Sequence, residues 1–208
     1  MGYCGIFCAM DKVLERLNLN GVYYLIHSIH NMAIVSYTAK EVVQTLTNFS
    51  SIRQSPVNYT ALQLCFALHM YHIALYWRKF RMDDWLHHGL MIGVALPIGG
   101  CLPAGTLLGY SLFFTTGLPG MIDYFILFLV RNEWANKDVE KRVNAWLNVW
   151  IRSPGCVSQA ALTCAYLSTL QVISPVFMYG AYISAFLNYW NGQYFMRQIV
   201  YDVGTRQI

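Results

Sequence analysis

The chain has 208 residues, of which 56% are hydrophobic, 15% aromatic and 12% charged, and its formal net charge is +4. Soluble domains usually carry about 25% charged residues, so this composition argues against a soluble globular protein. The positive charge is weak and dispersed along the chain, which gives no indication of a nucleic-acid partner. A chain of this length has room for one domain with about six membrane spans of roughly 20 residues each.

Six apolar runs follow one another along the chain and predict an all-α, polytopic membrane protein. In the fourth run, Gly117-Leu118-Pro119-Gly120 predicts a kink, and the last two runs meet at Ser174-Pro175 as a tight helical hairpin. We expect a cytoplasmic segment at 1–20, a transmembrane domain at 21–195 and a cytoplasmic tail at 196–208. The six runs are residues 21–39, 60–77, 85–102, 105–130, 156–174 and 175–195.

The distribution of basic residues predicts the orientation. Of the 14 Lys and Arg residues, only Lys40 and Arg53 fall on the side opposite the N-terminus in a six-span topology. Because cytoplasmic loops are enriched in Lys and Arg, both termini are expected in the cytoplasm. The glycosylation sequons at Asn48 and Asn58 lie in the same predicted lumenal loop. These patterns favour an integral protein of the endoplasmic reticulum or another endomembrane.

The segment between the fourth and fifth runs, residues 137–152, predicts an amphipathic basic helix. Val139, Val143, Trp146 and Trp150 recur at three- and four-residue spacing, and polar residues fill the other faces. Such a helix lies at a membrane surface or leads into the next span.

Ionisable residues gather in the predicted cytoplasmic half of the spans. The first and second runs each carry two histidines at three-residue spacing, which places both on one helix face, and a third pair opens the third run. A bilayer penalises ionisable groups unless they face a protein interior or a polar cavity, so we expect them to converge on one pocket. The candidate residues are His27, His30, His69, His72, His87, His88 and Asp123.

Structural roles remain open for several of these residues. A histidine within a span often makes a neutral hydrogen bond between helices, without chemistry. Asp84 suits the N-cap of the third helix, and Asp83 suits a solvated partner of the basic residues just before it. Alternatively, either carboxylate borders the pocket and orients an imidazole.

Metal binding has little support in the sequence. His69, His72, His87 and His88 could supply imidazoles, but no Glu lies within a predicted span to bridge two metal ions. The six cysteines have no CxxC spacing and are expected to be free thiols buried as small hydrophobic groups. No metal and no resident cofactor is predicted.

Residues 71–88, YHIALYWRKFRMDDWLHH, resemble the core of the TLC-domain family, which includes ceramide synthases and translocation-associated membrane proteins. The shared pattern is an aromatic-rich span, a short charged loop with Asp, and a paired His that opens the next span. Asn144, Trp150 and Arg152 also resemble an Asn, Phe and Arg stretch of the family. The resemblance covers roughly residues 20–200 and implies six spans in a ring around a cavity.

The resemblance implies a site for acyl transfer. In ceramide synthases the paired histidine belongs to the acyl-transfer site, so His87 and His88 would match that pair and Asp123 a later acidic residue. Further motifs of those enzymes have no counterpart here, since Gly89–Gly93 follows the pair and no later His occurs.

Three functions are compatible with these patterns. The first is a membrane protein that binds or processes a lipid or fatty acyl ligand, with acyl-CoA as the substrate if the protein is an acyltransferase. His87 or His88 would then serve as base or acyl acceptor, and the basic residues Arg78, Lys79 and Arg131 would attract phosphate or CoA. The second is a non-enzymatic lipid sensor, which the missing enzyme motifs favour. The third, a small proton or ion channel or transporter, is disfavoured because the ionisable residues occupy one half of the bilayer. A homo-oligomer is compatible with all three.

Overall fold

A computed structural model describes residues 2–102, 104–171 and 174–205, and these ranges contain helices and no strand. Three π-helical turns interrupt longer helices, at Met91–Ala95, Phe113–Gly117 and Asn148–Arg152, and a 3-10 turn spans Trp77–Lys79. The α-helices are α1 (Gly2–Glu15), α2 (Val22–Thr47), α3 (Ser51–Gln54), α4 (Tyr59–Tyr76), α5 (Met82–Leu90), α6 (Leu96–Cys101), α7 (Thr106–Leu112), α8 (Leu118–Arg131), α9 (Lys137–Leu147), α10 (Ser153–Ser168) and α11 (Pro175–Gly204).

The all-α class is confirmed for the described residues, and each of the six apolar runs falls largely on one helical stretch. The last two runs differ from the prediction at their ends, because α10 ends at Ser168, before the predicted 174, and α11 continues to Gly204, past the predicted 195. The third run is the continuous stretch α5–α6, and the fourth is α7–α8, where a π-helical turn lies beside the expected kink at Gly117–Gly120. The amphipathic segment forms α9 and continues through a π-helical turn into α10, the fifth run. Residues 172–173 and 206–208, within the predicted fifth run and tail, lie outside the described residues.

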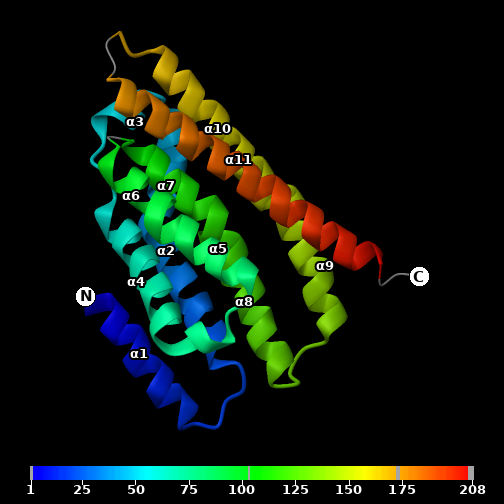
Figure 1. Cartoon of the computed structure of the whole chain (residues 1–208). Coiled ribbons are helices and arrows are strands. Elements are labelled where there is room, and N and C mark those ends of the chain that lie inside the picture. The colour runs from blue at the N-terminus through cyan, green and yellow to red at the C-terminus, as the bar shows by residue number, and fades with distance from the viewer. Residues whose placement is uncertain (1, 103, 172–173, 206–208) are drawn as a thin grey trace.

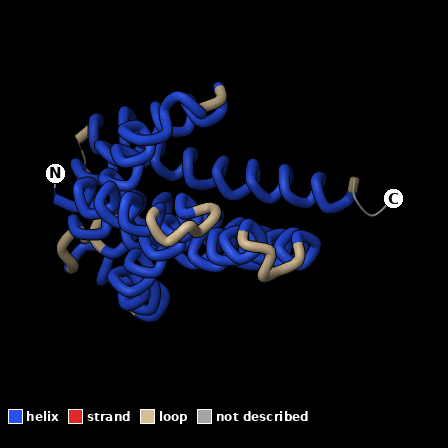
Figure 2. Tube along the Cα trace, turned by 90° about the horizontal axis from the view of Figure 1, so that it is seen from below, coloured by secondary structure: helices blue, strands red, loops and turns tan. Residues whose placement is uncertain are grey.

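Helix α2 is the centre of the bundle. It packs against α8 and α7 on one side and against α4 and α1 on the other. The α10–α11 pair runs diagonally across the bundle as an antiparallel hairpin (Figure 1). Toward its C-terminal end, α11 extends away from the other helices (Figure 2) and keeps contact with α9.

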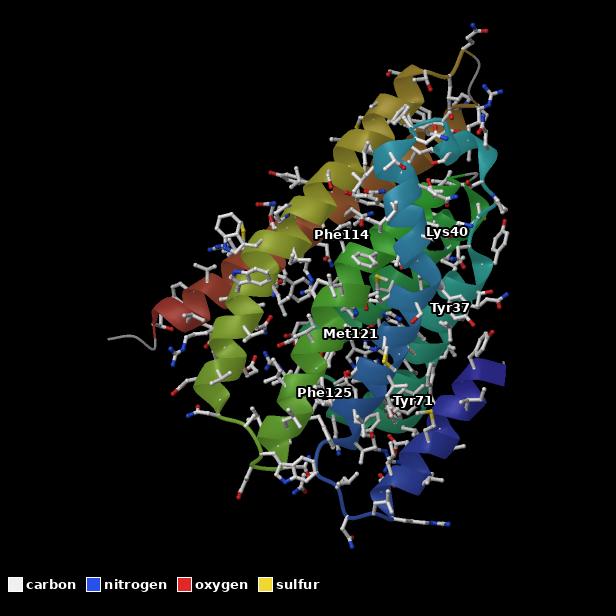
Figure 3. All side chains as sticks on the ribbon, turned by 180° about the vertical axis from the view of Figure 1, so that it is seen from behind. Tyr37, Lys40, Tyr71, Phe114, Met121 and Phe125 are labelled. Atoms are coloured by element: carbon white, nitrogen blue, oxygen red, sulfur yellow. The ribbon has the colours of Figure 1, made fainter. Side chains whose placement is uncertain are left out.

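The N-terminal segment is an ordered part of this bundle rather than a separate arm. Helix α1 packs along α4, and its Phe7 and Asp11 are buried there. The Asp11 carboxylate accepts hydrogen bonds from the hydroxyl groups of Tyr71 and Tyr76, the latter at 2.6 Å. Figure 3 shows Tyr71 between α4 and α1. A buried carboxylate with two phenol donors fixes α1 to the bundle.

Small residues set the distance between the helices around the site. A Cβ on Gly109 of α7 would lie 1.4 Å from Oε2 of Glu41 on α2, and one on Gly155 of α10 would lie 2.1 Å from the ring of Phe114. Figure 3 shows Phe114 directed from its helix toward α10. Glycine at these positions lets the side chains of Glu41 and Phe114 lie directly against the backbone of the neighbouring helix, where any Cβ would clash.

Helix α9 is amphipathic, but its polar face is buried and its apolar face is exposed, the reverse of a surface helix in a soluble protein. Its apolar stripe faces outward, with Val139 49% and Trp150, in the following π-helical turn, 65% exposed, while Glu140, Asn144 and Asn148 are buried. Large apolar side chains are also exposed along other helices, among them Met82, Leu86, Val176, Phe186 and Trp190. A polar interior beneath an apolar exterior is the distribution expected of a helix in contact with lipid.

By length and composition alone, one helical stretch of the described chain, Thr106–Arg131, is apolar enough to cross a membrane. Only 22% of its most apolar 18-residue window is buried in the structure, whereas the core helix of a soluble protein would be mostly buried. The structure thus supports one such helix on this criterion, and the six spans predicted from the sequence stay a prediction.

Candidate functional site

A cavity of about 430 Å³ lies at the centre of the bundle. Its walls come from α2, α4, α5–α6, α7–α8, α10 and α11, with Asn144 contributed by α9. Pockets that hold small molecules have volumes of roughly 300–1,000 Å³, so this one is large enough for a ligand.

The cavity has two chemically different ends. What we call the polar end lies toward the α4–α5 turn and is lined by His27, His30, His69, His72, His87, Asp123, Tyr124, Asn144 and Arg152. What we call the apolar end lies toward α6 and the start of α11 and is lined mainly by Leu62, Leu96, Leu102, Leu107, Leu108, Phe177 and Ala181. In Figure 1 the elements of the apolar end lie above those of the polar end.

The π-helical turns explain how whole helices line the cavity. Lining residues recur every fourth residue through the turn in α5–α6 (His87, Met91, Ala95, Gly99) and through the turn in α7–α8 (Leu108, Leu112, Thr116, Gly120, Tyr124). On a regular α-helix, a four-residue step would rotate each successive side chain by about 40°. The wider π-helical turn takes up that rotation and keeps the stripe facing the cavity.

Four histidines form two hydrogen-bonded pairs across the α4–α5 interface. Nε2 of His69 lies 3.3 Å from Nε2 of His87, and Nδ1 of His72 lies 3.2 Å from Nε2 of His88. His27, on α2, stacks on His72 with ring centroids 4.2 Å apart. The structure therefore brings together the three histidine pairs that the sequence places on three separate runs.

Backbone contacts determine which nitrogen of each ring carries a proton. Nδ1 of His69 lies 2.7 Å from the carbonyl oxygen of Cys65, and Nδ1 of His88 lies 2.8 Å from that of Asp84. A carbonyl oxygen only accepts, so Nδ1 is the donor in both rings, and in their neutral forms Nε2 carries the lone pair. His87 then donates through Nε2 to His69, which leaves its own Nδ1 with a lone pair.

The two members of the pair at 87–88 have different surroundings. His88 is buried, and both of its ring nitrogens are hydrogen bonded, to Asp84 and to His72. His87 is exposed, lines the cavity and forms its hydrogen bond with His69. Of the two, His87 is the residue that a ligand can reach.

On the other side of the polar end, a chain of hydrogen-bonded side chains leads from α9 to a half-buried arginine. The side-chain nitrogen of Asn148 donates to Oδ1 of Asn144 at 2.7 Å, and Nη1 of Arg152 donates to Oδ1 of Asn148 at 3.0 Å. The Arg152 guanidinium also lies 5.0 Å from the ring of Phe195. The four-residue spacing of these polar residues places them on one face and was a signal in the sequence, although none of them was among the predicted site residues.

Several buried polar atoms that belong to the cavity lining have no hydrogen-bond partner within the described parts of the chain. Unpaired buried polar atoms are rare in proteins and usually indicate a water or ligand. These atoms are Nε2 of His30, Nε2 of His72, Oδ1 of Asp123, Nε of Arg152, Oε1 of Gln159 and Oδ1 of Asn191.

The acidic and basic candidates of the charged loop lie outside the cavity. Asp83 is at the surface, where its Oδ1 is 3.3 Å from Nε of Arg81. Oδ2 of Asp84 accepts from the backbone N–H of Arg81 at 2.9 Å. Arg81 is the N-cap of α5 and Asp84 is its third residue, so Asp84 reaches back to the N-cap rather than occupying it as predicted. Neither carboxylate touches a histidine ring in these contacts, so orientation of an imidazole by Asp83 or Asp84 side chains is not what the geometry favours. Of these two residues, only Asp84 orients a histidine ring, because its backbone carbonyl oxygen accepts a hydrogen bond from Nδ1 of His88.

The predicted phosphate-binding residues separate into two groups. Lys79 and Arg131 line a second, open pocket at the same end of the bundle, whereas Arg78 lies outside it. The Arg78 guanidinium lies 5.4 Å from the ring of Trp77.

All six cysteines are free thiols, but only Cys65 and Cys156 are buried. Among the described residues, no three His, Cys, Asp or Glu side chains are placed to hold a metal ion.

Comparison of the chain with protein-family models, curated proteins and solved structures gives no match. The functional interpretation therefore depends on the cavity and the residues that line it.

Proposed function

We propose that the protein is a TLC-like, multi-pass membrane protein that holds a lipid or fatty acyl chain in its central cavity. The observation that carries the proposal is the cavity itself, which joins an apolar end to a polar end containing unpaired buried atoms. An amphipathic ligand would bury its hydrocarbon chain among the leucines and present its head to His72, Asp123 and Arg152. Burial of each methylene group would contribute about 0.8 kcal/mol.

A membrane location is supported by the inverted amphipathicity of α9 and the exposed aromatic and aliphatic side chains elsewhere. Trp146, Trp150 and Trp190 are all exposed, and tryptophan is enriched where helices meet the membrane interface. The charge distribution of the sequence further favours cytoplasmic termini and an endomembrane location, as part of the same proposal.

Within this proposal, acyl transfer is the reaction that the site supports best. An acceptor amine or hydroxyl would attack the thioester carbonyl of an acyl-CoA, and Nδ1 of His87 would take the proton from the acceptor. The bond to sulfur then breaks, and the leaving CoA thiolate takes the same proton from His87, which returns the imidazole to its neutral form. His69 positions His87 through the hydrogen bond between their Nε2 atoms. His88, with both nitrogens engaged, holds α5 against α4.

A non-enzymatic lipid sensor is the second candidate. The observation that favours it is the residue sequence after the paired histidine, where Gly89–Gly93 provides no side chain able to donate a hydrogen bond or transfer a proton. In a sensor the same cavity would hold the lipid, and His87 would contact its head without chemistry.

Two measurements test the proposal together. Lipids extracted from the purified full-length protein are identified by mass spectrometry, and the reconstituted protein is assayed with acyl-CoA and amine or lysolipid acceptors. Acyl transfer that is lost in His87→Ala and kept in Arg142→Ala, an exposed position on α9, would establish the enzyme. A specific bound lipid without transfer would establish the sensor. Absence of both a bound lipid and transfer would refute the proposal.

A further inference from the structure

A second pocket, of about 380 Å³, opens at the surface beside the polar end of the central cavity. It lies where the start of α2, the α4–α5 turn and the end of α8 meet, at the lower end of the bundle in Figure 1. Its lining consists of four aromatic and three charged residues: Tyr23, Tyr24, Tyr76, Phe80, Lys79, Arg131 and Asp84.

The two cations in this pocket are held by aromatic rings rather than by carboxylates. The Arg131 guanidinium lies 5.6 Å from the ring of Tyr24, and its Nη2 donates to the Tyr24 hydroxyl at 3.3 Å. Nζ of Lys79 lies 5.6 Å from the ring of Tyr76. Within the described chain, neither cation has a carboxylate within ion-pair distance. The aromatic rings orient the charges without neutralising them.

The one acidic group of the pocket is already engaged. Oδ2 of Asp84 accepts the backbone N–H of Arg81 at the start of α5, so this carboxylate serves as a helix cap. The pocket thus has two cations against one capping carboxylate, a balance that favours an anionic ligand. Lys and Arg side chains are the usual donors to phosphate, and the guanidinium can donate two parallel hydrogen bonds to it.

An aromatic wall separates this pocket from the central cavity. Tyr23, which lines the second pocket, has its ring centroid 4.1 Å from that of His27, which lines the cavity. Phe80 lies 4.5 Å from His88 by the same measure, and Tyr24 stacks on Tyr124 at 6.2 Å. A ligand in the second pocket would therefore contact the side chains that support the histidine pairs.

We infer that this pocket binds a phosphate group, held by Lys79 and Arg131 and flanked by the rings of Tyr23 and Phe80. The phosphate belongs either to a soluble nucleotide or to the head of an anionic phospholipid, because both present the same group to the two cations. The inference does not depend on which ligand fills the central cavity, and its test measures binding alone.

The test uses the full-length protein in an uncharged detergent. ADP is titrated in one arm and a short-chain, water-soluble phosphatidate in the other, with calorimetry as the readout. We expect one of the two to bind, with an affinity that falls about ten-fold in Lys79→Gln and in Arg131→Gln, because each removes one charge-assisted contact. Binding should also weaken as the salt concentration rises.

The matched control is Arg78→Gln, which removes the cation next to Lys79 that lies outside the pocket. This control should bind like the unaltered protein, and thermal unfolding should show that all three variants are folded. ADP binding that depends on Lys79 and Arg131 assigns the soluble source, and phosphatidate binding with the same dependence assigns the lipid head. The inference is overturned if neither compound binds, or if Arg78→Gln weakens binding as much as the pocket variants.

Discussion

The two ends of the central cavity are built by opposite means. At the polar end, directional hydrogen bonds fix each side chain, as in the pairs His69–His87 and His72–His88. At the apolar end, leucine and phenylalanine side chains from α6, α7 and α11 are placed by packing. The difference teaches that one end can select a ligand by the position of its atoms, whereas the other can select only by its length. Substitutions at the two ends should therefore produce different kinds of defect.

The largest effect is expected from Arg152→Ala at the polar end. The change removes a half-buried cation that lines the cavity and its hydrogen bond to Asn148, and hydrogen bonds to charged groups contribute about 1.5–3 kcal/mol. Retention of an anionic or strongly dipolar lipid should fall by roughly ten- to one-hundred-fold on that scale, measured as lipid per protein after purification. The exposed Arg142→Ala on α9 is the control. Equal lipid content in the two variants would remove Arg152 from the ligand site.

A smaller effect, and one of a different kind, is expected at the apolar end. Ala181→Phe should fill the part of the cavity that α11 lines and shorten the bound chain, with each excluded methylene costing about 0.8 kcal/mol, or about four-fold in affinity. Mass spectrometry of the extracted lipids would show a shift to shorter chains with an unchanged head. Ile183→Phe, on the exposed side of the same helix, should leave the chain lengths unchanged. A change of head without a change of length would contradict the assignment of this end.

The two adjacent histidines provide the third comparison, this time within the polar end. His88→Gln should lower the free energy of unfolding by about 1–2 kcal/mol, because two hydrogen bonds are disturbed and His72 loses its partner. His87→Gln disturbs one bond at an exposed position and should cost less. Thermal unfolding in detergent measures both. If His87→Gln proves the more destabilising variant, the division between a reachable and a supporting histidine is wrong.

The smallest effect is expected from substitutions on the far side of the bundle, beyond the apolar end of the cavity. Asn58 caps α4 through Ala61, and its amide nitrogen donates to Oε1 of Glu41 at 2.8 Å. Asn58→Ala should therefore cost about 1 kcal/mol, the usual value for loss of an N-cap. Asn48→Ala removes only exposed local contacts and should change the unfolding temperature little. Similar effects of the two substitutions would show that the cap at Asn58 contributes nothing.

The sequence predicts the helices well because apolar runs bounded by Gly, Pro and charged residues have few other solutions. It also predicts the gathering of the histidines and Asp123, since ionisable groups in apolar helices need a common polar environment. The direction of α9 was not predictable in the same way. Its periodicity identified the apolar stripe through Val139 and Trp150, but only packing shows that the stripe faces outward and that Asn144 and Asn148 face inward.

Other parts of the site depend on contacts between distant segments that no local pattern specifies. Arg152 was noted only within the family resemblance, and its half-buried place follows from two close approaches: Gly155 of α10 lies against Phe114, and Gly192 of α11 lies against Ser153 and Cys156 of α10. The burial of Asp11 is similar, because its two tyrosine donors lie some sixty residues later in the chain. Asp84 was weighed as the N-cap of its helix, but the structure gives that position to Arg81, and Asp84 supports the same helix end from three residues further along.

The π-helical turns carry a consequence for how this fold tolerates insertions and deletions. Each such turn accommodates one residue more than an α-helical turn would, so deleting a single residue within Phe113–Gly117 should restore a regular α-helix. The segments on either side would then keep close to their present orientation, because the extra residue of the π-helical turn is what takes up the rotation. A one-residue deletion in the α-helical stretch between Gly120 and Asp123 would instead rotate everything beyond it by about 100° around the helix axis. Asp123 and Tyr124 would then turn away from the cavity. The π-helical turn should therefore tolerate a one-residue deletion better than the regular part of α8.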